Sequence, residues 1–437
     1  MPHSNIGHRD VLRIALPMIL SNLSVPLVGM VDTAVMGHLP KTLWLAAVAV
    51  AGSLFALLFV AFNFLRMSAT GTTARAWGAG DMAASGRALA QGLVLAVLIG
   101  VTLIVLGPLL GGVGLPLIGA EGDITREARV YFDIRIWSAP FVLGNYVLVG
   151  WFLGMQNARA PLVVMLSNNL LNLSLDLWLV LGQGMHADGV AWASLVAEMA
   201  SFSLASWIAI RYLDAARLIR CNPRLFPTAE LRALLKVNSD LFVRTLALVG
   251  VLTAFTALGA RLGEGILAAN ALLMNLQTLL AFGLDGFAHA AEALVGRALG
   301  RRDAAMFRRV LLLTLQWSGG IALLYVLGFA AFGKELVGLL TSIPEVRATA
   351  ENYLGWMRLS PLVAVWAFWL DGVFIGAGWS RMMRNRMLLS AFGFLAGWYL
   401  LRGWGNQGLW LSLMLFFLLR GVTLGVGLIQ HRGLRPI

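Results

Sequence analysis

Long apolar stretches alternate along the chain with short polar or charged segments. Each stretch is close to the roughly 20 residues that a helix needs to cross a bilayer. Lipid offers no hydrogen-bond partner, so each stretch must satisfy its own backbone groups and is predicted to be a helix. The period-2 alternation of an outer-membrane barrel is absent from the sequence. The twelve predicted helices span 11–37, 45–70, 88–113, 130–155, 161–182, 189–211, 236–261, 265–292, 310–333, 352–378, 386–402 and 408–430.

Composition supports an all-α integral membrane protein and excludes several other classes. Of the 437 residues, 59% are apolar and only 12% are charged, whereas a soluble domain carries about 25% charged residues. An ordinary soluble enzyme, a disordered chain and a nucleic-acid-binding protein are therefore not expected. The single cysteine, Cys221, cannot form an internal disulfide. No Cys/His cluster has the spacing of a metal site, and no P-loop for ATP is present.

The distribution of Lys and Arg predicts the orientation in the membrane. If the N-terminus is cytoplasmic, the inner segments carry 21 of these residues and the outer ones seven. Lys and Arg accumulate in cytoplasmic loops. The bias therefore places both termini in the cytoplasm, and we expect a multi-pass protein of a bacterial-type inner membrane.

The chain divides near its midpoint into two similar halves. A basic linker at 212–235 separates a first lobe, 1–211, from a second, 236–437. A shift of 222 positions superposes many residues of the two, among them the pairs Gly37 and Gly259, Asp81 and Asp303, Gly154 and Gly376. Six helices per lobe keep both lobes in the same orientation. The sequence therefore predicts a parallel internal repeat, which transporters often use with the substrate path between the repeats.

Asp32 is the most informative acid within the predicted spans. A charged residue at mid-membrane costs at least about 2.5 kcal/mol, so it is a functional candidate by default. No basic residue lies near Asp32 in its own helix, and apolar surroundings favour the neutral acid. Such a group could exchange protons, although a neighbouring polar group could equally cap it. Pro17 and Pro26 in the same helix are expected to bend it.

A second group of candidates lies in the fifth and sixth predicted helices. Asn172 and Asp176 are four residues apart and share one helix face, while Asn169 lies on a nearby face one turn earlier. Carboxylate and amide oxygens suit a proton or a small cation such as Na⁺. Ser194 could add a hydroxyl oxygen. The alternative is a hydrogen-bonded cluster that only holds helices together.

The second half contains further ionisable residues. Asp285 and Asp371 could extend a cation route, line a drug cavity, or pair with an arginine such as Arg244 or Arg358. Asp240 and Arg244 are four apart, and we expect a local ion pair between them. Glu198 and Glu292 are expected to reach water near helix ends. Met30 and Met36 could line an adaptable drug pocket, because a thioether is flexible and polarisable.

Several segments, taken together, resemble one family of transporters. These segments are VDTAVMGHL (31–39), the Asn172-xxx-Asp176 pattern, the paired turns ARAWGAGD and GRALGRRD, FGLDGFAHAAEALVG (282–296) and LDGVFIGA (370–377). In this order they resemble the multidrug and toxic compound extrusion (MATE) transporters, and the last two segments resemble its DinF branch. The resemblance covers essentially the whole chain.

The resemblance implies two six-helix lobes in a V that opens alternately to each side of the membrane. It implies a secondary-active antiporter that exports amphiphilic, often cationic drugs, with H⁺ favoured over Na⁺ as the coupling ion and no other cofactor. Asp32 matches the family's coupling aspartate, Asn172 and Asp176 match its cation-site pair, and Ser194 falls where some members carry threonine. A monomer in the lipid bilayer is expected.

Two other classes of function stay open on the sequence alone. A flippase for lipid-linked precursors would need a cationic cavity for a pyrophosphate group, for which five arginines within the spans are candidates: Arg66, Arg135, Arg244, Arg358 and Arg420. A membrane-embedded enzyme would need a nucleophile and a base, or metal ligands, in one pocket. Only His289 among the six histidines lies in a span. The sequence therefore favours a transporter over an enzyme.

Overall fold

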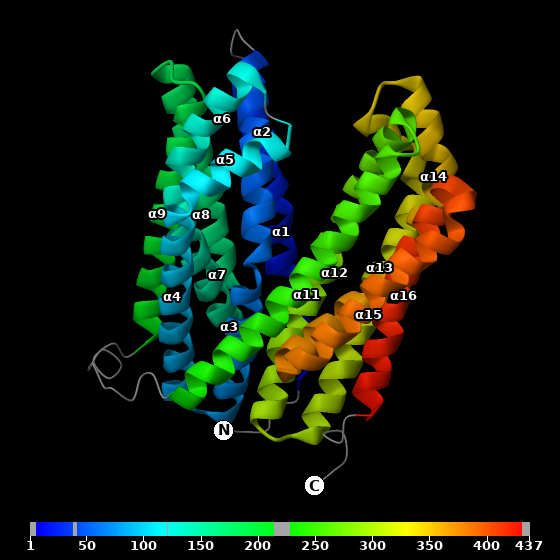
Figure 1. The fold of residues 1–437 in the computed structure, drawn as a ribbon. Coiled ribbons are helices and arrows are strands. Elements are labelled where there is room, and N and C mark those ends of the chain that lie inside the picture. Colours follow the sequence, from blue (N-terminus) through cyan, green and yellow to red (C-terminus); the bar gives the residue numbers. More distant parts are fainter. Residues whose placement is uncertain (1–5, 38–41, 120, 214–227, 431–437) are drawn as a thin grey trace. The chain divides into compact units, whose positions relative to one another are not determined.

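The protein is helical throughout the part that can be described. The computed structural model describes residues 6–37, 42–119, 121–213 and 228–430, with the backbone alone for 25–37. No strand occurs among these residues (Figure 1). They hold ten stretches long and apolar enough to cross a membrane, one of which, Ser380–Gln430, covers two of the predicted spans. Together with α1 (His8–Gly37), these helices overlap all twelve predicted spans, and the predicted all-α membrane fold is confirmed.

The described helices follow one another with short connections. Those of the first half after α1 are α2 (Thr42–Ala61), α3 (Phe64–Ala79), α4 (Met82–Val105), α5 (Gly107–Leu117), α6 (Gly122–Arg135), the 3₁₀ turn η1 (Ile136–Ser138), α7 (Ala139–Gly154), α8 (Arg159–Asp176), the π-helical turn η2 (Leu177–Gly182) and α9 (Ala187–Tyr212). Those of the second half are α11 (Thr228–Ala260), α12 (Glu264–Gly300), α13 (Ala304–Leu340), α14 (Pro344–Ala377), α15 (Ser380–Leu401), the 3₁₀ turn η4 (Arg402–Trp404) and α16 (Gly405–Gln430).

The two halves match helix for helix, but the first half is more broken. The pair α2 and α3 corresponds to the single α12, α4 and α5 to α13, and α6 with α7 to α14. Two of the breaks have a proline just after them, Pro108 in α5 and Pro140 in α7. Proline lacks the N–H that a helix interior requires and clashes with the preceding turn. The aligned helices α13 and α14 carry Ala330 and Leu362 at these positions and continue, with Pro361 accommodated inside α14 one residue earlier.

The turns that start α4 and α13 repeat in atomic detail. Asp81 caps α4 by accepting a hydrogen bond from the Ala84 N–H at 2.8 Å, and Asp303 caps α13 in the same way from Met306 at 2.8 Å. The residue before each cap has a left-handed backbone, with φ of +74° at Gly80 and +56° at Arg302. Both capped turns are separated by the predicted 222 positions, which confirms the internal repeat.

A close helix contact also repeats. In the first half, a Cβ added to Gly150 of α7 would lie 2.3 Å from the carbonyl oxygen of Arg66 in α3. In the second half, a Cβ on Gly372 would lie 2.2 Å from the carbonyl oxygen of Ala288 in α12. Only glycine allows two backbones to approach this closely, as small residues do between membrane helices. The repeat therefore extends from the turns to helix packing.

The described residues form two compact units. One contains Leu20–Leu234 and the other joins Met1–Ile19 to Leu235–Ile437, so α1 contributes to both. We refer to them as the N-unit and the C-unit. The boundaries predicted from the sequence, 1–211 and 236–437, stay a prediction, and residues 214–227 of the predicted linker lie outside the described residues.

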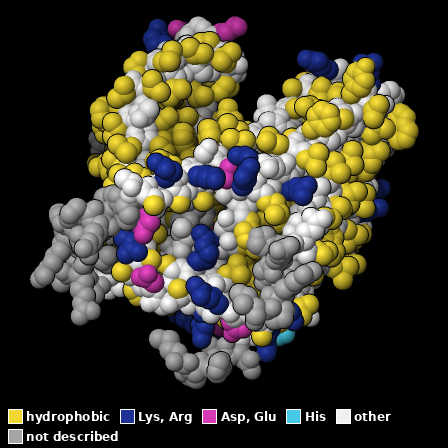
Figure 2. Space-filling model, turned by 60° about the horizontal axis from the view of Figure 1, so that its bottom comes forward, with side chains coloured by type: hydrophobic (Ala, Val, Ile, Leu, Met, Phe, Trp, Pro, Cys, Tyr) yellow, Lys and Arg dark blue, Asp and Glu magenta, His cyan; other side chains and the backbone are white. Residues whose placement is uncertain are grey.

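Large apolar side chains cover the outer surface of each unit. Leu98 and Leu117 of the N-unit are 60% and 80% exposed, and Leu339 and Ile429 of the C-unit are 82% and 80% exposed. Figure 2 shows these apolar flanks, with Lys and Arg side chains gathered on the face turned toward the viewer. Water would not tolerate so much exposed apolar surface. The flanks of the helices therefore suit contact with lipid.

Candidate functional site

Three of the four predicted cation-coupling residues lie together in the core of the N-unit. Asn172 and Asp176 follow one another by one turn on α8, and the Asn172 amide donates a hydrogen bond to the Ser194 hydroxyl of α9 at 3.4 Å. The exposed fractions are 3% for Asn172, 0% for Asp176 and 6% for Ser194. An acid, an amide and a hydroxyl are thus held out of reach of bulk solvent.

The oxygens of this cluster suit a small cation or a proton. The Asn172 Oδ1 atom is buried and accepts no hydrogen bond from any described residue. A buried acceptor without a donor is costly, and a cation or an added proton would relieve that cost. Within the described residues, no group of three or more His, Cys, Asp or Glu side chains could hold a metal ion. A bound alkali ion would therefore depend on amide and hydroxyl oxygens beside Asp176.

The helix changes its geometry immediately after Asp176. Residues Leu177–Gly182 form the π-helical turn η2, which continues α8. Such turns are rare and occur frequently at functional sites. The wider π-helical turn changes the direction in which the side chains after Asp176 point. Asp176 therefore lies where the helix geometry changes.

The helix that carries Asp32 is only partly described. Asp32, Pro26, Met30 and Met36 lie on the helical backbone of α1, but their side chains lie outside the described residues. Pro17 is half-buried within the same helix. The coupling role of Asp32 and the bending role of the two prolines therefore stay predictions.

Asn169 connects α8 to α1. Its amide donates a hydrogen bond to the Ser24 carbonyl oxygen at 3.2 Å. Serine and asparagine often hold membrane helices together in this way. The contact gives Asn169 a structural role, while its predicted place in a drug cavity stays a prediction.

An acid that the sequence interpretation placed near water is the main surprise of the N-unit. Glu198 lies in the middle of α9, where its carboxylate accepts a hydrogen bond from the Asn145 amide of α7 at 3.3 Å. The expected place at a helix end is wrong, whereas the side chain does stay partly exposed. The four-residue spacing from Ser194 to Glu198 was the available signal, because it places both on one helix face.

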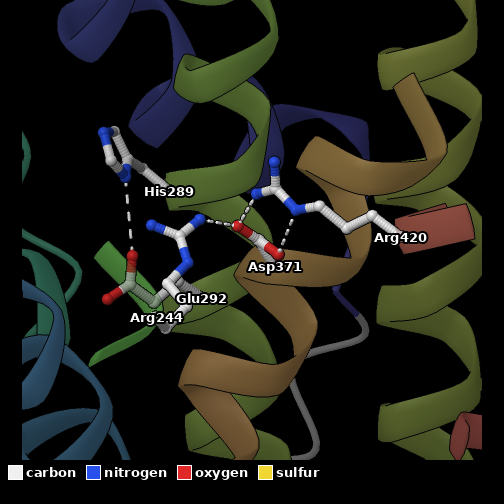
Figure 3. A network of polar contacts seen from close by, with 5 residues as sticks. All are labelled: Arg244, His289, Glu292, Asp371 and Arg420. Atoms are coloured by element: carbon white, nitrogen blue, oxygen red, sulfur yellow. Dashed lines mark hydrogen bonds and ion pairs between the residues drawn. The ribbon is translucent and has the colours of Figure 1, made fainter. Parts of the chain in front are cut away.

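The C-unit contains a buried network of ionic contacts (Figure 3). Asp371 of α14 lies between two guanidinium groups, that of Arg244 from α11 and that of Arg420 from α16. The exposed fractions of these three residues are 4%, 5% and 2% for Arg244, Asp371 and Arg420. The charge of Asp285, half-buried on α12, also acts on Arg420. The network joins three helices far apart in sequence.

The network overturns the expected pairing of Arg244. Asp240 does not bind its neighbour on the same helix, but pairs with Arg384 of α15 at 2.6 Å and accepts a hydrogen bond from Ser380 at 3.0 Å. Arg244 instead binds Asp371, as the sequence offered as an alternative. Contacts between helices offer both arginines a buried partner, which outweighs the small gain of an i, i+4 pair.

A second pair lies beside the network. His289 and Glu292 are one turn apart on α12, with 3.5 Å between Nδ1 and the nearer carboxylate oxygen. Glu292 is 1% exposed, so the expectation that it reaches water is also wrong. The closest packing of α12 on α14, at Ala288 and Gly372, surrounds this pair.

The chain resembles known proteins over most of its length. The MatE family model matches residues 17–178 and 241–397. The DNA damage-inducible protein F of Escherichia coli is 42% identical over 414 residues, covering 94% of this chain and 90% of that protein. A probable multidrug resistance protein NorM of Synechococcus is 27% identical, and the match covers 98% of this chain and 94% of that protein.

Solved structures share the same fold. An outward-facing multidrug resistance MATE family transporter of the MOP superfamily has a TM-score of 0.86 at 19% identity, covering 98% of this chain and 97% of the other. A MOP superfamily transporter from Pyrococcus furiosus has a TM-score of 0.85 at 20% identity, covering 98% and 97%. At these identities the likeness concerns the fold. Family model, relative and fold agree, and the chain belongs to the multidrug and toxic compound extrusion (MATE) family of membrane transporters.

Proposed function

We propose that this transporter is a secondary-active antiporter that exports amphiphilic, often cationic drugs in exchange for protons. The observation that carries the proposal is the buried oxygen cluster of the N-unit, in which Asp176 is completely buried and Asn172 has an acceptor without a donor. Burial of an ionisable group within a membrane protein costs free energy, so such a group is a functional candidate by default. Relatives named as probable multidrug resistance proteins support drugs as the substrates.

A proton suits the cluster better than a sodium ion. Sodium, like other hard cations, needs several oxygen ligands. Among the described residues, the cluster offers one carboxylate, one free amide oxygen and one hydroxyl. A proton needs only one carboxylate oxygen and one acceptor. Sodium bound by Asp32, Asn172, Asp176 and Ser194 is the second candidate, and the experiment below distinguishes the two ions.

Coupling would follow from two conformations with different affinities. A gradient shifts a conformational equilibrium only through differential binding to the two states. Protonation at Asp32 and Asp176 would change the bend of α1 at Pro17 and Pro26 and weaken drug binding in a cavity near Met30 and Met36. The lobes 1–211 and 236–437 would then exchange access, joined by the linker 212–235.

The surroundings of the transporter belong to the same proposal. The excess of Lys and Arg in alternate connections supports cytoplasmic termini in a bacterial-type inner membrane. The chain would act there as a monomer. The flippase for lipid-linked precursors is not proposed, because Arg244 and Arg420 are bound to Asp371 and give no open cationic cavity.

The test is dye transport by the full chain in proteoliposomes. A pH gradient or a sodium gradient would be imposed separately, with ethidium as the cationic probe. We expect uptake against the dye gradient only with the pH gradient, and a loss of at least about tenfold in Asp176→Asn, or roughly 1.4 kcal/mol of coupling. Asp123→Asn, at an aspartate whose side chain is 70% exposed, is the matched control.

Two results would contradict the proposal. Transport driven by the sodium gradient alone would identify Na⁺ as the coupling ion. Ser194→Ala would then be the next variant to test. Transport by Asp176→Asn at the wild-type rate would remove the cluster from the mechanism. Asp32→Asn, measured alongside, tests the predicted role of the undescribed side chain.

A further inference from the structure

A polar ladder connects the facing sides of α8 and α9. Asn168, Asn172 and Asp176 recur every four residues on α8, and Ser194 and Glu198 do so on α9. Asn172 bonds Ser194 at 3.4 Å, and Asn168 lies close enough to Glu198 to act on its carboxylate. The two rungs have the register of an antiparallel helix pair. One continuous polar face therefore leads from Asp176 to Glu198.

Glu198 lies near the middle of α9, and its side chain is partly exposed. It is 11 residues from the start of α9 and 14 from its end, which corresponds to about 16 Å and 21 Å along the helix axis. Its carboxylate accepts a hydrogen bond from Asn145 of α7 at 3.3 Å, and Asn168 of α8 lies close enough to act on it. Asn145, 8% exposed, also donates to the Ser201 hydroxyl at 3.4 Å. The carboxylate is thus held by two separate helices.

The charged and titratable groups around Glu198 come from α3, α6 and α7. Arg135 at the end of α6 acts electrostatically on Glu198, and its guanidinium lies 5.4 Å from the ring centre of Phe55 and 5.5 Å from that of Tyr131. Tyr146 of α7 interacts electrostatically with Glu198 and with Arg66 of α3. The rings offer Arg135 a favourable place even when Glu198 is neutral.

The surrounding amides can serve both protonation states of Glu198. The Asn145 N–H group now donates to the carboxylate, while the Oδ1 atoms of Asn145 and Asn168 are buried and accept no hydrogen bond from any described residue. A protonated carboxyl group is a donor and needs an acceptor. Rotation of either amide would supply one. The site can therefore accept a proton, at the cost of the hydrogen bonds that the rotated amide now donates.

We propose that Glu198, held by Asn145 and Asn168, is a second proton-binding site of the transporter, linked by the Asn168–Asn172 face of α8 to the site at Asp176. The inference rests on the proposed proton antiport and extends it. A proton from water would bind a carboxylate oxygen of Glu198 as the amide turns, and would leave when a cationic substrate binds. The transporter would then exchange more than one proton in each cycle.

The test counts protons released when a cation binds. Purified full-length protein in detergent and weak buffer would receive tetraphenylphosphonium, with a pH indicator in solution. We expect Glu198→Gln to release about half as many protons per bound cation as the wild type, because one of two linked sites is gone. Its cation binding should depend less steeply on pH. Glu198→Asp should restore the release, and Glu121→Gln, at an exposed glutamate, should match the wild type.

The outcomes separate this inference from the proposed function. Wild-type release in Glu198→Gln, together with reduced release in Asp176→Asn, would overturn the second site and leave the antiport standing. Absence of any proton release from the wild type would overturn both. Thermal unfolding and tetraphenylphosphonium binding of each variant show whether it folds, and Glu198→Asp keeps the inference testable if Glu198→Gln does not.

Discussion

The two halves of this transporter share a backbone framework but differ in the polar side chains that several aligned positions carry. The shift of 222 that superposes the capped turns puts Phe394 and Trp398 of α15 where α8 has Asn172 and Asp176. It puts Val149 of α7 where α14 has Asp371. The N-unit thus has an acidic, amide-rich face between two helices, and the C-unit has a network of opposite charges. Repetition preserved what the backbone needs and left side-chain chemistry free to diverge.

The difference has a physical cause. A helix cap and a glycine contact are requirements of the backbone, and any helix pair with that geometry must meet them. A buried charge is not tied to one position of the backbone, because any oppositely charged or hydrogen-bonding partner within reach can satisfy it. Each half could therefore acquire its own polar residues without disturbing the shared frame. The predictions below test the difference first and the similarity afterwards.

The largest effect is expected from breaking the network of the C-unit. Asp371→Ala would leave two buried guanidinium groups without their carboxylate, which should lower the free energy of unfolding by about 3–5 kcal/mol. Thermal unfolding in detergent measures the loss. Val149→Ala at the aligned position of the N-unit is the control, and we expect it to cost much less, on the order of 1 kcal/mol.

A triple variant sharpens that test. Arg244→Leu, Asp371→Val and Arg420→Leu together replace the network by apolar side chains, with the valine that α7 carries at the position aligned with Asp371. Such replacements are often neutral or stabilising by about 1–4 kcal/mol. If the triple variant is as unstable as Asp371→Ala alone, the network contributes net stability to the C-unit and is more than a set of mutually compensating charges.

A smaller effect should be equal in the two halves. Gly150→Ala and Gly372→Ala would each push a methyl group against a backbone carbonyl, at 2.3 Å and 2.2 Å before any shift. Overpacking of this kind typically costs about 1–3 kcal/mol. Gly52→Ala, in a helix with open space around the glycine, is the control. Clearly unequal losses of stability at Gly150 and Gly372 would show that the two halves differ in how well this helix contact tolerates an added methyl group.

The smallest effect concerns the repeated helix caps. Asp81→Ala and Asp303→Ala each remove one side-chain acceptor from the first turn of α4 or α13. Loss of such a cap costs typically about 1 kcal/mol. Asn at either position should retain most of the stability, because its amide oxygen accepts the same bond. A cap whose loss to alanine is silent in unfolding experiments would contradict the role assigned to it.

Much of the fold was accessible from the sequence. Hydropathy located every helix because, in lipid, an apolar stretch of sufficient length has no other way to satisfy its backbone. The constant shift of 222 located the repeat because turns depend on local residues such as Asp81 and Asp303. The breaks in the first half were not predicted, although Pro108 and Pro140 indicate two of them.

The sequence by itself also determined the pairing of residues within one helix, such as Asn172 with Asp176, since helical periodicity alone puts them on a common face. Only the tertiary structure decided which helices face each other. Arg244 binds an aspartate 127 residues away and not the one four residues away. Glu198 meets amides from two other helices near the middle of α9. The reason is geometric: the rotation of a helix about its axis, set by the packing of all its neighbours, selects the partners of its buried charges, and no local pattern in the sequence records it.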